Sequence, residues 1–241
     1  MKDNVTEAAE LGAFSFDRNG FFLEPALLSP STAAAPAKRS FYRRYGKRAF
    51  DIAFIVLTLP FSLSLIAICA LALWIESGNP FYTQARLGRD GKRFYILKLR
   101  TMVRDADAVL EHYLSTNLTM RREWNEMQKL SHDPRITRVG HFLRATSLDE
   151  LPQLVNVLKG EMSLVGPRPM MPNQLDMYGD ATAYDAVDPG ITGLWQVSSR
   201  NNARFAYRRE VDATYERGLT FGSDLSILLK TVGVVLRRTG K

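Results

Sequence analysis

Cysteine and histidine are scarce in this sequence. Cys69 is the single cysteine among 241 residues, which excludes an internal disulfide and a cysteine-based metal cluster. A chain without disulfides is typical of a reducing compartment. The three histidines lack the spacing of paired zinc ligands, so we expect no zinc site. They are His112, His132 and His141.

An excess of negative charge is also absent, because 32 Lys and Arg residues oppose 25 Asp and Glu residues. The net charge of +7 favours an anionic partner such as nucleic acid, anionic lipid or a phosphorylated small molecule. We expect no nucleic acid, since the positive charges flank an apolar run and do not alternate with aromatic residues.

The start of the chain has little with which to build a core. Residues 1–37 are acidic on balance and end in a run of small residues and proline. We therefore expect residues 1–40 to form a disordered leader. This segment lacks the basic start and immediate apolar stretch of a secretory signal.

Long apolar runs are absent except for residues 52–75, which carry no charged side chain. A straight helix of this length rises roughly 36 Å, enough to cross a hydrocarbon core of about 30 Å. Positive charges lie on both sides of the run, however, and such flanks mark a cytoplasmic face. Pro60 also interrupts the helix. Residues 41–76 therefore form either a spanning helix or a basic juxtamembrane helix followed by a re-entrant membrane helix-hairpin.

Polar side chains around this run have expected partners. A hydroxyl of Thr58 or Ser62 is expected to satisfy the backbone carbonyl that the proline frees. Asp51, at the start of the run, is expected to pair with Lys47 or Arg48.

Residues 77–241 are expected to form one small domain. Asp-Gly between two strand-like runs, residues 81–87 and 93–99, predicts a β-hairpin. Lys98 and Arg100 at its end are compatible with a solvated basic face or with phosphate contact, and the hairpin alone does not decide between them.

Helices are predicted over much of the remaining domain. Residues 105–130 predict two surface helices that break near residues 115–117, and residues 174–187 predict another helix. Residues 189–197 predict a turn and a short extended piece. Residues 225–236 carry apolar side chains at helical spacing, so this helix either lies on an anionic membrane surface or packs in the core.

An adjacent carboxylate pair, Asp149 and Glu150, stands at the start of a predicted helix that ends at Gly160. The pair has two interpretations of similar weight. It completes a capping box with Ser147, or it is a reactive site, where the helix dipole favours ionised carboxylates that serve as nucleophile or metal ligand. Pro152 weakens the first interpretation, because it would lie inside a helix capped by Ser147.

A short apolar strand and a proline-locked arginine follow this helix. Residues 162–165 predict the strand, and Pro169 forces Arg168 towards an extended backbone. A guanidinium held in this way can bind a phosphate through two parallel hydrogen bonds.

Several blocks of the sequence together resemble the bacterial monotopic phosphoglycosyl transferases, which start exopolysaccharide and other glycoconjugate assembly. The resemblance runs from about Lys47 to the C-terminus. The blocks are Lys47-Arg48-x-x-Asp51, Phe81-Tyr82-x-Gln84-x-Arg86-x-Gly88, Lys98-Leu99-Arg100-Thr101-Met102, Ser147-Leu148-Asp149-Glu150-Leu151-Pro152-Gln153, Gly166-Pro167-Arg168-Pro169 and Gly190-Ile191-Thr192-Gly193-Leu194-Trp195-Gln196.

The resemblance implies a mostly helical α+β fold on the cytoplasmic face of the bacterial inner membrane, with a re-entrant helix and amphipathic interfacial helices. It implies a ping-pong reaction in which a UDP-sugar donates its sugar 1-phosphate to polyprenyl (undecaprenyl) phosphate and releases UMP. Residues 105–130 resemble an insertion in transferases that begin rhizobial-type exopolysaccharides, which weakly favours galactose or glucose. By this resemblance residues 77–241 are the small cytoplasmic catalytic domain. A non-catalytic membrane-anchored regulator or assembly partner on the same fold is the alternative, and a homodimer is compatible with the sequence.

By the same resemblance, Asp149 matches the family's nucleophile and Glu150 completes an acidic dyad that would hold Mg²⁺. The expected substrate and phosphate-binding residues are Lys98, Arg100, Arg144, Arg168, Arg200, Asp212 and Asp224. One position departs from the family pattern: Leu59 precedes Pro60, where members commonly have serine. This departure concerns the hydrogen bonding of the membrane helix and leaves catalysis untouched.

Overall fold

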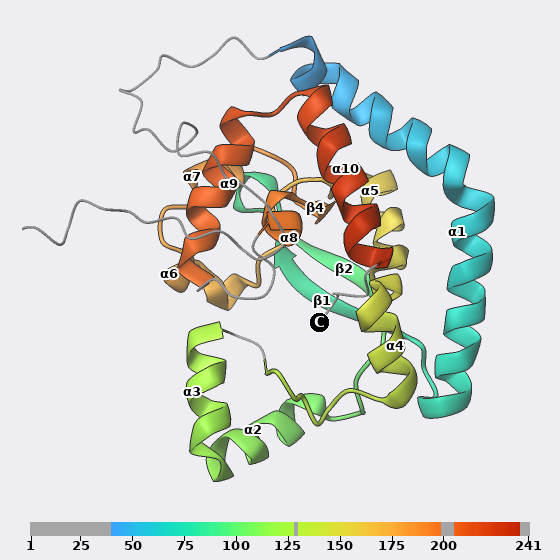
Figure 1. Ribbon diagram of the computed structural model, residues 1–241, viewed down its shortest axis with the longest axis vertical. Helices are drawn as coiled ribbons and strands as arrows, with labels where there is room; N and C mark the ends of the chain where they lie inside the picture. The colour runs from blue at the N-terminus through green and yellow to red at the C-terminus, as the bar shows by residue number, and fades with distance from the viewer. Residues whose placement is uncertain (1–39, 128–129, 199–204, 237–241) are drawn as a thin grey trace, which may run out of the picture. The chain divides into compact units, whose positions relative to one another are not determined.

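The computed structural model describes residues 40–127, 130–198 and 205–236. The predicted leader lies outside these residues except for Ser40, and the predicted site residue Arg200 lies outside them as well. The described chain is mostly helical, with two small sheets of two strands each (Figure 1). The predicted α+β class is therefore confirmed.

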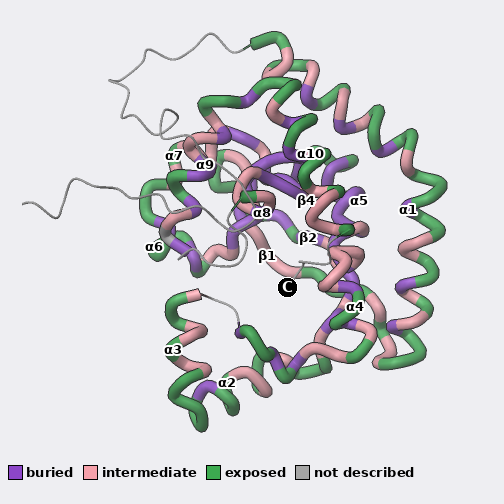
Figure 2. Tube along the Cα trace, viewed as in Figure 1, coloured by how far each residue is buried: buried purple, intermediate pink, exposed green. Residues whose placement is uncertain are grey.

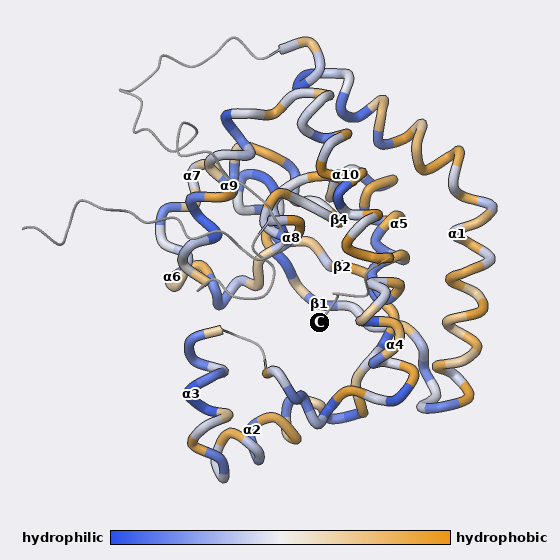
Figure 3. The backbone as a smooth tube through the Cα atoms, in the orientation of Figure 1, coloured by the Kyte–Doolittle hydropathy of each residue, from blue (hydrophilic) through white to orange (hydrophobic). Residues whose placement is uncertain are grey.

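The apolar run forms one long helix, α1 (Lys47–Ser77), which continues a π-helical turn, η2 (Tyr42–Gly46). Pro60 lies inside α1, and the helix bends between its two halves without folding back on itself (Figure 1). The expected helix-hairpin is therefore a single bent helix. Most of its apolar surface is exposed, as the burial and hydropathy colouring of α1 shows (Figures 2 and 3).

The hydroxyls near Pro60 do not take the expected partner. Proline at this position frees the carbonyl four residues earlier, that of Val56. Thr58 donates to the Phe54 carbonyl over 2.9 Å, and Ser62 donates to the Leu59 carbonyl over 3.2 Å. The hydroxyls thus bond to other turns of the helix.

The start of α1 is attached to the domain by a buried polar cluster. Lys47 Nζ lies 2.7 Å from both the Asp224 carboxylate and the Val165 carbonyl. The predicted pairing of Asp51 with Lys47 or Arg48 is wrong, because Asp51 instead accepts hydrogen bonds from the Ser163 hydroxyl and the Leu164 amide. Arg48 donates to the backbone carbonyls of Val157 and Leu158. The bonds of Asp51 join α1 to strand β3 (Ser163–Val165), and those of Arg48 join it to helix α5 (Leu154–Lys159).

The predicted hairpin is confirmed. β1 (Phe81–Leu87) pairs antiparallel with β2 (Arg93–Leu99), and Phe81 lies opposite Leu99. The turn is a short 3-10 segment in which Asp90 and Gly91 both have positive φ, as expected for Asp-Gly. The hairpin carries Lys98 to the domain centre, where β2 lies against the segment that holds the acid pair.

The remaining helices agree with the predictions in part. The two surface helices are confirmed as α2 (Ala106–Thr116) and α3 (Leu118–Met127). The single helix predicted over residues 174–187 is instead two short helices, because Gly179 has a φ of 78° and interrupts it. The full set of later elements is α4 (Arg138–Thr146), η4 (Leu148–Gln153), α5 (Leu154–Lys159), η5 (Pro172–Gln174), α6 (Leu175–Tyr178), α7 (Thr182–Asp185), β4 (Gly190–Thr192), α8 (Leu194–Ser198), η6 (Phe205–Tyr207), α9 (Arg208–Arg217) and α10 (Phe221–Leu236).

Helix α10 packs in the core on one side, which is one of its two predicted roles, and its other side is apolar and exposed. Ile227 belongs to the core cluster that also contains Ile96 and Val165. The outer side carries a stripe of exposed apolar residues at helical spacing. They are Phe221, Leu225, Leu229, Val232 and Leu236.

A second sheet joins two glycine-rich motifs. β3 pairs in parallel with β4, and the pairing places Gly166 against the start and end of β4. The extended piece predicted over residues 189–197 is confined to β4, and α8 replaces its second half. A β-carbon at Gly193 would lie 1.9 Å from the Gly166 carbonyl oxygen, so only glycine allows this approach. The contact holds the loop that carries Arg168.

We expect Gly193→Ala to lower the free energy of unfolding by about 3 kcal/mol, because backbone atoms cannot yield as a side chain can. Gly233→Ala in α10 is the matched control, since its β-carbon would meet nothing within 4 Å. The control should raise stability by about 0.5–1 kcal/mol. Urea unfolding of both variants in detergent measures the difference, and similar midpoints for the two would contradict this packing account.

Candidate active site

The acid pair lies in the 3-10 segment η4, directly after α4. Ser147, between the two helices, has a φ of 57° and makes no side-chain cap to η4, so the capping-box interpretation does not describe this segment. Pro152 is accommodated within η4. Both Asp149 and Glu150 are buried, at 8% and 9% exposure, and buried carboxylates require compensating charges.

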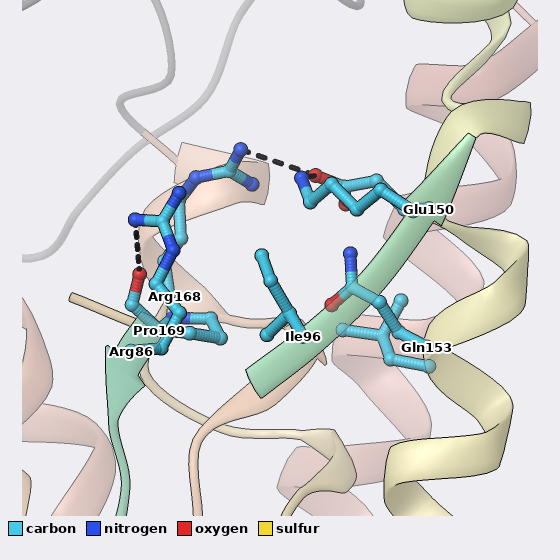
Figure 4. A pocket seen from close by; sticks show the side chains of 8 residues that line it. Arg86, Ile96, Glu150, Gln153, Arg168 and Pro169 are labelled. Atoms are coloured by element: carbon cyan, nitrogen blue, oxygen red, sulfur yellow. Dashed lines mark hydrogen bonds and ion pairs between the residues drawn. The ribbon is translucent and has the colours of Figure 1, made fainter. Parts of the chain in front are cut away.

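Two cations compensate Glu150. Lys98 Nζ lies 2.7 Å from Glu150 Oε1, and Arg168 Nη2 lies 3.1 Å from the same oxygen. Lys98 comes from the hairpin and Arg168 from the loop after β3, so three distant parts of the sequence meet here. Figure 4 shows the Arg168 guanidinium pointing at Glu150 across a small pocket.

The cations that compensate Glu150 also act on Asp149. Burial raises the pKa of Asp149, and Lys98 opposes this shift more strongly than Arg144 and Arg168 do. Arg144 is held by a 3.0 Å hydrogen bond from its Nε to the Thr101 hydroxyl. The structure thus brings Asp149 together with three predicted phosphate-binding cations.

Asn156 keeps the acid pair and the hairpin in register. Its amide oxygen accepts from the Leu97 amide over 3.0 Å, and its amide nitrogen donates to the Tyr95 carbonyl over 2.7 Å. Both bonds are to residues that directly precede Lys98 in β2, and they therefore fix where its side chain starts. The sequence carried no signal for this role, because an asparagine within a short helix has many other uses.

Two arginines missed as site residues extend the cluster of positive charge. Arg86 lines the pocket beside Arg168, and its Nη1 donates to the Pro169 carbonyl over 3.1 Å. Arg208 donates to the backbone carbonyl of Arg168. Arg86 stands in one of the motif blocks, which was the signal that could have found it, whereas the pattern around Arg208 gave none.

Three other predicted residues lie elsewhere in the domain. Arg100 is partly exposed at the end of the hairpin, and its Nη2 donates to the Phe81 carbonyl over 3.4 Å. Asp224 is fully buried in the cluster that attaches α1, where its carboxylate accepts from Lys47 and so stabilises the fold. Asp212 accepts a 2.9 Å hydrogen bond from the Tyr178 hydroxyl and is close enough to Arg208 for the two charges to interact.

Asp212 predicts a pH dependence of stability. Burial raises the pKa of Asp212 to about 6, against the opposing effects of Arg208 and Tyr178. The folded chain therefore holds this proton more tightly than the unfolded chain, and the resulting stability is lost as the pH rises from about 4 through about 6.

Between about pH 4.5 and pH 7 the free energy of unfolding of the wild type should fall. We expect Asp212→Asn to reduce this fall by an amount on the order of 2 kcal/mol. Melting temperatures of the wild type and the variant across that range measure it. Asp176→Asn, at an exposed position on α6, should leave the wild-type profile unchanged. Parallel profiles for the wild type and Asp212→Asn would contradict the prediction.

The donor set fits a magnesium ion that arrives with a diphosphate. No cluster of three or more His, Cys, Asp or Glu side chains suited to a metal occurs within residues 40–127, 130–198 and 205–236. Mg²⁺, however, usually takes only one or two protein carboxylates and completes its shell with water and substrate phosphates. Asp149 and Glu150 are the two carboxylates of the site that would be available to such an ion.

Comparison with known proteins identifies the family of the chain. The family model described as bacterial sugar transferase matches residues 42–238. The chain is 47% identical over 198 residues to a UDP-galactose-lipid carrier transferase of Erwinia amylovora, covering 82% of this chain and 42% of that protein. It is 45% identical over 205 residues to an undecaprenyl-phosphate galactose phosphotransferase of Salmonella typhimurium, covering 85% and 43%. It is 43% identical over 196 residues to the exopolysaccharide production protein ExoY of Rhizobium meliloti, covering 80% and 87%.

The chain thus spans less than half the length of the first two of these relatives and most of the length of the third. The matches confirm the sugar transferase resemblance that the motif blocks predicted. The chain belongs to the bacterial sugar transferase family.

Proposed function

We propose that this chain transfers a hexose 1-phosphate, from UDP-galactose or UDP-glucose, to polyprenyl phosphate and releases UMP, as the first membrane step of exopolysaccharide synthesis. The observation that carries the proposal is the buried Asp149-Glu150 pair facing Lys98 and Arg168. The names of two relatives include UDP-galactose and undecaprenyl phosphate, and these names support the proposed substrate classes.

The residues of the site suit a two-step phosphoryl transfer. An Asp149 carboxylate oxygen attacks the phosphorus that carries the sugar, and the bond to UMP breaks as UMP leaves with its electron pair. A phosphate oxygen of the lipid then attacks the same phosphorus and breaks the bond to Asp149. The carboxylate is regenerated, and the product is a polyprenyl diphosphate sugar.

The cations supply the electrostatic stabilisation that this reaction needs. Lys98, Arg144 and Arg168 oppose the charge of the phosphates in a buried site, where fixed charges act more strongly than in water. Asp149 and Glu150 would hold Mg²⁺, which when bound neutralises charge on the diphosphate. Glu150 already joins Lys98 to Arg168, so it orders the cations before substrate arrives.

The attachment of α1 favours a re-entrant course through the cytoplasmic leaflet of the inner membrane. Lys47 near its start bonds to Asp224, and Glu76 near its end accepts a 3.0 Å hydrogen bond from the Val139 amide. Both ends therefore contact one domain, whereas a spanning helix would carry them to opposite faces. The middle of α1 is apolar and exposed, with Leu57 at 82% and Phe61 at 74% exposure. The exposed stripe of α10 would lie at the same surface.

Labelling of single cysteines in cells tests this topology. Ser40→Cys and Lys92→Cys, each in a Cys69→Ala background, place one thiol at an exposed position on each side of α1. We expect a membrane-impermeant maleimide to miss both in intact cells and to label both in inside-out vesicles. Labelling of the two positions from opposite faces would show a spanning helix.

The reaction is tested by UMP release from purified protein with Mg²⁺ and polyprenyl phosphate. Galactose, glucose and N-acetylhexosamine donors are compared at equal concentrations. Release with UDP-galactose or UDP-glucose supports the proposal and names the sugar. Lack of release with every donor would support the alternative of a non-catalytic membrane-anchored protein.

A further inference from the structure

Arg86 is the pocket arginine for which the proposed reaction has no role so far. It lies on β1, within the block that begins at Phe81, and lines the pocket together with Lys98, Glu150 and Arg168. Figure 4 shows its guanidinium alongside that of Arg168, pointing towards the Pro169 carbonyl. Two arginines so close repel each other, and Glu150 is the carboxylate that offsets part of this repulsion.

The hydrogen bonds of Arg86 position it without neutralising it. Its Nη1 donates to the Pro169 carbonyl and its Nη2 donates to the side-chain oxygen of Gln84, and both acceptors are uncharged. Its Nε is buried and has no hydrogen-bond partner within the described part of the chain. A guanidinium has five N–H groups, so donors remain for a ligand.

The charge of the pocket also calls for an anion. Among the described residues that line the pocket, Glu150 is the only carboxylate, and it is already contacted by Lys98 and Arg168. Burial and the neighbouring Arg168 lower the pKa of Arg86 to about 10, so Arg86 is charged at neutral pH. Arg86, the third cation of the pocket, is therefore available to bind a phosphate.

The position of Arg86 indicates which phosphate it meets. Arg86 lines the pocket with Glu150 and Arg168, whereas Asp149 is not among the described residues that line it. Arg86 thus lies at the end of the site away from the nucleophile. In an in-line displacement the leaving oxygen is opposite the attacking one, so the group that is not transferred lies at that end.

We propose that Arg86, positioned by Gln84 and the Pro169 carbonyl, binds the phosphate group that is not transferred: the nucleotide phosphate in the first step and the lipid phosphate in the second. The inference rests on the proposed two-step reaction, because both groups must then occupy the position opposite Asp149 in turn. The ligand class is a phosphomonoester attached to a larger group. The chemistry of the transferred phosphorus is left to Asp149 and its neighbours.

Direct binding to the full chain in detergent, measured by calorimetry, tests the proposal. We expect Arg86→Lys to weaken UMP binding roughly 10- to 100-fold, since a single ammonium cannot replace a fixed guanidinium. Binding of hexose 1-phosphate, the transferred group, should change less than about twofold on the same scale. Arg89→Lys is the matched control, because Arg89 lies on the same hairpin in a surface ion pair with Asp188.

The lipid is examined separately through the KM for polyprenyl phosphate, which should rise in Arg86→Lys by a factor similar to that for UMP. Unchanged UMP affinity, or an equal loss for UMP and hexose 1-phosphate, would overturn the proposal. A higher dissociation constant for UMP together with an unchanged KM for polyprenyl phosphate would show that the two phosphates do not share one position.

A second variant protects the test against misfolding. Gln84→Leu leaves the charge of Arg86 in place and removes one hydrogen bond that orients it, so UMP binding should weaken by a smaller factor, about 3- to 10-fold. If Arg86→Lys fails to fold, unchanged UMP affinity in Gln84→Leu overturns the proposal. UMP binding that depends on Arg86, in a protein that releases no UMP from any donor, would refute the proposed function while this phosphate site stands.

Discussion

Asp149→Asn is expected to reduce UMP release at least about 10³-fold, because an amide cannot act as the nucleophile that the carboxylate provides. The amide has nearly the same size and keeps one acceptor oxygen, so the packing of η4 should be preserved. Stability should change little or rise slightly, since a buried carboxylate is replaced by a neutral group. UMP release and the melting temperature, measured on the same preparation, separate chemistry from folding.

Asp107→Asn is the matched control, because Asp107 is exposed on α2 and outside the pocket. It should release UMP at the wild-type rate. Release by Asp149→Asn within about tenfold of wild type would contradict the assignment of Asp149 as nucleophile, given the loss that removal of a nucleophile causes.

Lys98→Met is expected to lower the rate of UMP release by about 10²- to 10³-fold, the usual effect of removing one preorganised charge from a buried site. Lys98 bonds to Glu150 and is the group that most strongly opposes the burial-induced rise in the pKa of Asp149. Its loss should therefore raise the pKa of Asp149 further. Because the nucleophile must be deprotonated, the acid limb of the pH–rate profile should move to higher pH.

Lys92→Met, at an exposed position on the same hairpin, is the control and should behave as wild type. Measurement of initial rates across the pH range tests both parts of the prediction. An acid limb that stays in place or moves to lower pH in Lys98→Met would show that Lys98 does not act on Asp149.

Local features of the fold could be predicted from the sequence because their causes are local. Asp90 and Gly91 specify the hairpin turn through their backbone preferences alone. The break between α2 and α3 at Asn117 has the same origin, since polar residues that favour capping interrupt two helix-forming stretches. The apolar run was found by composition, and its bend follows from Pro60.

Contacts between distant segments could not be predicted in the same way. The sequence placed Asp51 beside Lys47 because they are one helical turn apart, yet Lys47 bonds to Asp224, 177 residues away. The residues alone give the acid pair two interpretations of similar weight, and the resemblance to the transferases favours chemistry over capping. The contacts of the pair with Lys98 and Arg168 come only from the fold. Arg86 was visible only as part of a motif, and its place in the pocket depends on the packing of β1 against Pro169.

The central claim, covalent transfer through Asp149, is tested most directly by mass spectrometry of the protein after incubation with the UDP-hexose donor and Mg²⁺, without polyprenyl phosphate. The account predicts that the protein gains the mass of one hexose phosphate, that peptide analysis places it on Asp149, and that addition of polyprenyl phosphate removes it. UMP release that requires the lipid, with no adduct on the protein, would contradict the account and indicate direct transfer from donor to lipid.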